Sequence, residues 1–319
     1  AASLGLEDRF ISNPVAEATV RMTLGLTYQK MGDYSAAEPH LERALRIRRE
    51  HLGEDAPATL QSMCDLAWQY IFQGRFDEAE TPALRALETG RRALGGDHPV
   101  VLSAMECCGF MYVVGFQSKK AEPIVHEGYE TSRRVFGQEH ERTISFMNIL
   151  AWLYDAQHRQ DAALDMSIAA FEVSERVLGR EHPETIQAMN QLGRAYTVEG
   201  RFEEAEALLR ESVKLSRQVL GEGHLFTLWY IQRLASVYRA QEQYEPMENI
   251  TAEALHIARE IPGKLMVTGY LRWHLWLRVV ALSADAREHY DTGRYDEAVN
   301  LLARQERLRQ SLDYGQTEL

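Results

Sequence analysis

The chain has 319 residues, of which 45% are hydrophobic and 26% charged, and this balance is typical of a folded protein. The formal net charge of −12 argues against DNA or RNA as a partner, because nucleic-acid binding needs clustered cations that neutralise phosphates. No apolar run approaches the roughly 20 residues of a membrane span, and the cysteines form no CxxC pair, which favours a reducing compartment and a cytoplasmic location.

An internal repeat of 42 residues organises most of the chain. A glycine- and histidine-containing block recurs with its histidine at His98, His140, His182 and His224, always 42 residues apart. We therefore expect six repeat units over residues 16–265, beginning at residues 16, 58, 100, 142, 184 and 226. We further expect residues 1–15 to form an N-terminal cap or linker, 266–312 a variant seventh helix pair that caps the array, and 313–319 a disordered tail.

Each unit combines a tyrosine, small residues and a turn in fixed places. Position 13 is always tyrosine and position 10 is always small: Tyr28, Tyr70, Tyr112, Tyr154, Tyr196 and Tyr238, with Gly25, Ala67, Gly109, Ala151, Gly193 and Ala235. Small residues let two helices approach closely, and the tyrosine fills the space beside them. At position 17, Gly32, Gly74 and Gly200 permit a left-handed turn, whereas Phe116 and His158 stand there in units 3 and 4. The pattern predicts helices at roughly positions 2–16 and 19–36 of each unit.

The ends of the units carry signals that stop one helix and start the next. Leu-Gly or Phe-Gly closes the second helix, and a proline at 57, 99 and 183 blocks its continuation. The threonines that follow are predicted N-caps of the next helix, and they are Thr59, Thr143, Thr185 and Thr227. We expect the periodic histidines to satisfy the turn between units, because residues displaced along an array do not converge on one metal ion.

These residues resemble the tetratricopeptide repeat. The 42-residue spacing with LGxxHPxT between units is similar to the kinesin-light-chain type, and the first unit also resembles repeat regions of large bacterial signalling proteins, including those attached to serine/threonine kinase domains. The resemblance covers about residues 16–265. It implies an all-α fold, a right-handed α-solenoid of stacked antiparallel helix pairs, and a role in binding other proteins.

Signatures of catalysis or of metal binding are absent from the sequence. We find no HExxH, no Cys/His cluster, no phosphate loop, no GxGxxG and no GxSxG elbow, so we predict no catalytic residue, no metal site and no cofactor. Two other periodic features are interpreted as core packing: Cys108, which replaces a leucine, and the ladder of Met63, Met105, Met147 and Met189.

One face of the first helices is the candidate binding surface. Positions 4, 7, 11 and 14 share this face, which lines the concave channel in the family that the repeats resemble, and its residues vary from unit to unit. We predict a peptide-binding groove with an apolar half from Trp68, Phe110 and Trp152. Its amides, which would hold a backbone, are Asn148, Gln187, Asn190 and Gln232, and its acid-binding part is Arg194, Arg233 and Arg239; Trp229 also lies in the groove. The alternative is that Trp68 and Trp152 only pack between helices.

Two functional hypotheses follow. The first is a scaffold or adaptor that binds a peptide or partner segment in its concave groove. The second is a regulatory or oligomerisation region of a larger signalling enzyme, such as a serine/threonine kinase, whose catalytic domain is absent from this chain. The missing initiator methionine favours the second hypothesis slightly. Neither hypothesis predicts the identity of the partner or the oligomeric state.

Overall fold

The structure, a computed structural model, describes residues 13–259 and 295–313, and all regular secondary structure in these residues is α-helical. The all-α class is therefore confirmed. Twelve consecutive helices form six antiparallel pairs, and one more follows. The helices are α2 (Pro14–Lys30), α3 (Tyr34–Leu52), α4 (Pro57–Phe72), α5 (Phe76–Leu94), α6 (Pro99–Val114), α7 (Ser118–Phe136), α8 (Glu141–Ala156), α9 (Gln160–Leu178), α10 (Pro183–Val198), α11 (Phe202–Val219), α12 (Leu225–Ala240), α13 (Tyr244–Arg259) and α15 (Tyr295–Asp313).

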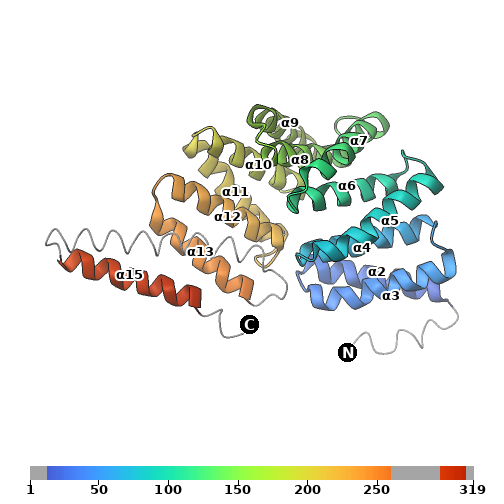
Figure 1. Ribbon diagram of the computed structural model, residues 1–319, viewed down its shortest axis with the longest axis horizontal. Helices are drawn as coiled ribbons and strands as arrows, with labels where there is room; N and C mark the ends of the chain where they lie inside the picture. Colours follow the sequence, from blue (N-terminus) through green and yellow to red (C-terminus); the bar gives the residue numbers. More distant parts are fainter. Residues whose placement is uncertain (1–12, 260–294, 314–319) are drawn as a thin grey trace.

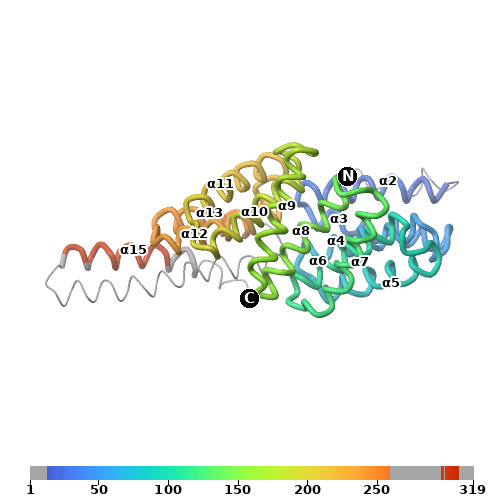
Figure 2. The backbone as a smooth tube through the Cα atoms, turned by 90° about the horizontal axis from the view of Figure 1, so that it is seen from above, coloured from blue at the N-terminus to red at the C-terminus, as the bar shows by residue number. Residues whose placement is uncertain are grey.

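The pairs stack side by side along an arc, as a solenoid does (Figure 1). The arc runs from α2 and α3 through α8 and α9 to α12 and α13, and the view from above shows the same succession (Figure 2). Beyond it, Arg304 of α15 donates from Nε to Glu248 of α13 over 2.7 Å. The helix α15 falls within the predicted seventh pair, whereas residues 266–294 of that pair, like most of the expected N-terminal cap and the tail, lie outside the described residues.

Histidines, and not threonines, cap the first helices of units 3 to 6. In each of α6, α8, α10 and α12, the Nδ1 atom of the preceding histidine accepts a hydrogen bond from the backbone N–H two residues later, at 3.1–3.2 Å. The threonine prediction is wrong because each helix begins two residues earlier than expected, which buries the threonine inside the first turn. There Thr143 and Thr227 donate to the carbonyls of Gly137 and Gly221 at 2.8 Å.

The turn within each pair requires a left-handed residue. Gly74 and Gly200 have φ of 75° and 76° there, as predicted. In units 3, 4 and 6 the same conformation is held by side-chain-bearing residues, Phe116, His158 and Glu242, with φ between 57° and 59°. Because L-residues meet steric resistance in this region, these three turns are less favourable than the glycine turns.

The core follows the repeat positions. The predicted methionine ladder is buried, with at most 1% of any side chain exposed, and Cys108 is fully buried. A Cβ atom on Gly109 would lie 2.6 Å from Cγ2 of Val125, so only glycine allows α6 and α7 to pack this closely. Within the described ranges, no helix combines the length and apolarity needed to cross a membrane.

Candidate functional site

Aromatic side chains gather on the inner side of the arc. We call Trp68, Phe72, Phe110, Trp152, Phe226 and Trp229 the aromatic seam. Phe110 is its centre: its ring centroid lies 5.1 Å from that of Trp68, 5.5 Å from Trp152, 5.7 Å from Phe226 and 6.1 Å from Trp229. Only 1% of Phe110 is exposed, because the surrounding rings cover it.

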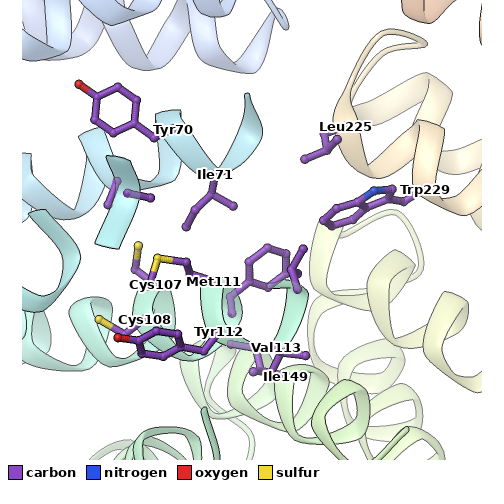
Figure 3. Close-up of a cluster of buried hydrophobic side chains, with 14 of the residues drawn as sticks. Tyr70, Ile71, Cys107, Cys108, Met111, Tyr112, Val113, Ile149, Leu225 and Trp229 are labelled. Atoms are coloured by element: carbon purple, nitrogen blue, oxygen red, sulfur yellow. The ribbon is translucent and has the colours of Figure 1, made fainter. Parts of the chain in front are cut away.

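The seam joins helices that are distant in sequence. Phe226 and Trp229 belong to the first turns of α12, whereas Phe72 and Phe110 belong to α4 and α6. The ring centroids of Phe72 and Phe226 are 5.9 Å apart. Figure 3 shows Trp229 and the neighbouring Leu225 facing Ile71 and Val113 across the inside of the arc. The beginning of the sixth pair therefore closes onto the second and third pairs.

On one side of the seam, an open pocket of about 460 Å³ extends across units 3 to 6. We call it the arginine pocket. Its floor carries the indoles of Trp152 and Trp229, and its cations are Arg194 and Arg233. The complete lining is Val113, Val114, Phe116, Ser118, Trp152, Asp155, Ala156, His158, Arg194, Thr197, Trp229, Gln232, Arg233 and Ser236.

The two arginines of this pocket are held in place by their neighbours. The guanidinium of Arg233 lies 5.1 Å from the ring centroid of Trp152, and its Nη1 donates to Gln191 over 2.8 Å. Burial lowers the pKa of Arg233 to about 10, which still leaves it charged at neutral pH. Nε of Arg194 lies 3.3 Å from Oδ2 of Asp155. Two guanidinium groups thus face one carboxylate, and the pocket has an excess of positive charge.

On the other side of the seam lies a smaller cavity of about 270 Å³, which we call the carboxylate pocket. It is lined by Asp65, Glu106 and Glu184, together with rings of the seam and polar side chains; the full set is Gln29, Asp65, Trp68, Phe72, Glu106, Phe110, Ser145, Ile149, Glu184, Gln187 and Phe226. The described residues contain no group of three or more His, Cys, Asp or Glu side chains placed to hold a metal ion.

Burial governs the protonation of these carboxyl groups. It raises the pKa of Asp65 to about 6, against the lowering effect of a hydrogen bond from Gln61. It raises the pKa of Glu184 to about 8, with a further increase from the nearby charge of Glu106. The pKa of Glu106 is also raised by burial, and a hydrogen bond from Ser145 opposes the increase. The free pocket therefore holds fewer negative charges at neutral pH than its composition indicates.

The structure distributes the predicted site residues over both pockets. Trp152, Trp229 and the two arginines share the arginine pocket with Gln232, whereas the carboxylate pocket receives Trp68, Phe110 and Gln187. Arg239 is exposed and lines neither pocket.

Two predicted amides are corrected. Asn148 is fully buried and donates from Nδ2 to the backbone carbonyl of Glu184 at 3.0 Å and to its carboxylate at 2.8 Å. Asn190 is 1% exposed and donates to Ser212. Both amides are used inside the fold and cannot hold a ligand backbone. Position 7 does not have one environment in all units, because Glu106 and Gln232 at the same position line the two pockets.

Several lining residues were missed by the sequence reasoning. Asp65, Glu184, Phe72 and Phe226 occupy positions 8, 1, 15 and 1 of their units. These positions lie three or four residues from positions 4 and 11, so they share the same helix face, and the chosen stripe was too narrow. A polar signal was available for Asp65, an acidic residue among the apolar residues of α4.

Comparisons with known proteins agree with this architecture. A solved structure of nearly identical TPR-like repeats of a kinesin light chain from Podosopora anserina covers 65% of this chain and 97% of its own, with 22% identity and a TM-score of 0.51. A Rap protein complexed with Competence and Sporulation Factor covers 93% of this chain and 99% of its own, with 11% identity and a TM-score of 0.54. At these identities the likeness concerns the fold alone. No curated protein matches the chain.

The repeats also match a family model directly. The tetratricopeptide repeat model matches residues 16–92, 161–218 and 196–260, which together make up more than half of the chain. The match includes unit 1, most of unit 2, the end of unit 4, unit 5 and most of unit 6. This confirms the resemblance deduced from the repeat period: the chain belongs to the tetratricopeptide repeat family.

Proposed function

We propose that this chain is a protein-interaction scaffold that binds a segment of a partner protein in the arginine pocket. The observation that carries the proposal is the pocket itself, an open cavity of about 460 Å³ on the concave face with two indoles and two guanidinium groups in its lining. The tetratricopeptide repeat family supports a binding role. The proposal assigns no catalytic activity, and it retains the expected cytoplasmic location and a protein, not a nucleic acid, as the partner.

The chemistry of the pocket defines the segment that fits. Trp152 and Trp229 offer apolar faces to a bulky side chain, and aromatic residues are frequent anchors at interfaces. Arg194 and Arg233 exceed the single carboxylate of Asp155 in charge, which favours an acidic side chain or a terminal carboxylate. We therefore expect a short segment with an apolar residue next to an acidic one. A scaffold of this kind would serve equally as the docking region of a larger signalling enzyme.

The test begins with the intact chain as bait, with bound proteins identified by mass spectrometry and affinity measured by calorimetry. Trp152→Ala is expected to weaken binding by about 2 kcal/mol, near thirtyfold, if this indole is an anchor. Arg194→Glu is expected to slow association and to lessen its dependence on salt, because it reverses a charge that steers the partner.

A matched control separates the pocket from the general surface. Arg239→Glu changes the net charge equally, but Arg239 is exposed and lines neither pocket. This variant should bind like the parent chain. If Trp152→Ala and Arg194→Glu keep the parental helicity and also bind like the parent, the arginine pocket is not the binding site.

A further inference from the structure

The carboxylate pocket combines two groups that attract organic cations. Its walls include the rings of Trp68, Phe72, Phe110 and Phe226, and cations are stabilised over aromatic faces, most strongly over indole. The same cavity is lined by acidic side chains from three different helices, α4, α6 and α10. Rings and carboxylates that line one cavity are an arrangement by which proteins bind ammonium and guanidinium groups.

The acidic groups of this pocket are incompletely matched within the protein. Glu106 has a cationic neighbour, since Nη1 of Arg142 lies 3.4 Å from its Oε2. In the described part of the chain, Asp65 and Glu184 form no direct ion pair with a Lys, Arg or His side chain. Asp65 accepts a hydrogen bond from Gln61 and lies within the electrostatic reach of Arg48. Glu184 accepts a hydrogen bond from Asn148. Next to the pocket, but outside its lining, Oδ1 of the fully buried Asn148 accepts no hydrogen bond from the described residues.

We propose that the carboxylate pocket is a binding site for an organic cation, an ammonium or guanidinium group held between Asp65, Glu184 and the rings of the aromatic seam. The cavity volume of about 270 Å³ lies just below the range of drug-sized ligand sites, roughly 300–1,000 Å³, and suits a side-chain-sized group. The site is a different cavity from the arginine pocket, so this proposal does not depend on the function proposed above.

The cation has two possible sources with the same chemistry. It is either a free polyamine or a basic side chain of a bound polypeptide. In both cases the ligand places a positive charge in direct contact with Asp65 and Glu184, and binding favours their ionised forms over the protonated forms that burial favours in the free pocket.

Methyl NMR tests the proposal with the full chain. Ile149 lines the cavity, so its δ1 methyl resonance reports occupancy. We expect titration with methylguanidinium to shift this resonance in a saturable manner, whereas methylurea, a neutral molecule of the same shape, should not. Asp65→Asn combined with Glu184→Gln should weaken binding at least about tenfold, because the charge-assisted hydrogen bonds are lost. Circular dichroism verifies that the variant is folded.

Controls and parallel titrations make the outcome decisive. Glu203→Gln removes one negative charge from an exposed position of α11 and should leave binding unchanged. Tighter binding of spermidine than of an acetylated Gly-Arg-Gly amide would support a free polyamine, and the reverse would support a partner's side chain. The proposal is overturned if methylguanidinium and methylurea act alike on Ile149, or if the folded Asp65→Asn, Glu184→Gln variant binds as tightly as the parent.

Discussion

Backbone strain at single residues distinguishes the turns of this array. At position 17, glycine occupies the left-handed region in units 1, 2 and 5, but Glu242 does so in unit 6 with φ of 59°. An L-residue in this region is disfavoured by about 1–2 kcal/mol. A glycine there removes the steric cost and increases the flexibility of the unfolded chain, which offsets part of the gain.

Glu242→Gly is therefore expected to raise the free energy of unfolding by about 0.5–1 kcal/mol. The reverse change, Gly200→Ala, should lower it by about 1 kcal/mol. A Cβ atom at Gly200 would have nothing within 4 Å, so its cost would be purely conformational. Urea unfolding of both variants measures the two changes in the free energy of unfolding. If both variants are stabilised or both are destabilised, steric strain at position 17 does not explain the difference between the turns.

Glu184 makes stability depend on pH. Burial and the charges of Glu106 and Glu141 raise its pKa to about 8, and the hydrogen bond from Asn148 opposes this; Tyr230 of α12 also lies within its electrostatic reach. A glutamate side chain in an unfolded chain has its ordinary pKa, near 4.5. Between these two values the folded state binds a proton that the unfolded state has lost, so stability falls as pH rises through this window.

Glu184→Gln should abolish this contribution. The variant's free energy of unfolding is expected to fall less than the parent's between about pH 5 and pH 8, because glutamine does not titrate. Denaturant unfolding at several pH values measures the difference, with Glu203→Gln as the control for a change in net charge. Parallel pH profiles of parent and Glu184→Gln would show that Glu184 titrates normally.

Between elements, packing of neighbouring pairs depends on matched volumes. Gly128 of α7 faces Phe146 of α8, and a Cβ atom on Gly128 would lie 2.2 Å from Cε1 of that ring. The corresponding residues of the preceding pair boundary are Ala86 and Ala104, both fully buried. The boundary between α7 and α8 thus pairs a phenylalanine with a glycine, whereas the boundary between α5 and α6 pairs two alanines.

This interpretation predicts non-additive effects of mutation. Gly128→Ala should cost about 1–3 kcal/mol through overpacking, and Phe146→Ala about 3–5 kcal/mol through the cavity it leaves. Their combination recreates the pair found at Ala86 and Ala104, so it should cost less than the sum by about 1 kcal/mol or more. A double-mutant cycle from denaturant unfolding gives this coupling, and strict additivity would mean that the helices shift to absorb the change.

The sequence predicted well those features of an element that depend on residues close together in the chain, and it predicted poorly those that depend on contacts with other helices. Helix positions were predicted within about three residues, because caps, turn residues and apolar period are local signals. The capping atom was mistaken, since Thr143 and His140 are both plausible caps until the helix start is known. The amides of Asn148 and Asn190 were misplaced because a shared helix face does not reveal which part of it a neighbouring helix covers.

The closure of the arc belongs to the whole molecule and could not be read from the repeat. Small rotations between successive pairs accumulate along a solenoid, and only their sum brings Phe226 to Phe72 and Phe110. The rings of the seam line both pockets, Trp152 and Trp229 the arginine pocket and the other four the carboxylate pocket. Their residues were therefore predictable as a stripe along the first helices, but not as two sites with different charge.

The aromatic seam also changes how stability should be distributed. In an open array each pair contacts only its neighbours, and stability is a sum of nearest-neighbour terms. Here Phe226 of the sixth pair packs at 5.9 Å from Phe72 of the second pair and at 5.7 Å from Phe110 of the third. These contacts couple distant pairs directly, so the two ends of the arc should unfold together.

Phe226→Ala is expected to open the arc. The radius of gyration from small-angle X-ray scattering should increase, and hydrogen exchange should accelerate in α4 and α6 as well as in α12, because the contacts of Phe226 with Phe72 and Phe110 are lost. The cost should be about 2 kcal/mol, less than for a fully buried phenylalanine because Phe226 is partly exposed. Phe171→Ala removes a similarly half-buried ring from α9, away from the seam, and should lower stability without changing the radius. If both variants keep the parental radius and exchange pattern, stacking between neighbouring pairs alone maintains the arc, and the seam only fills its inner face.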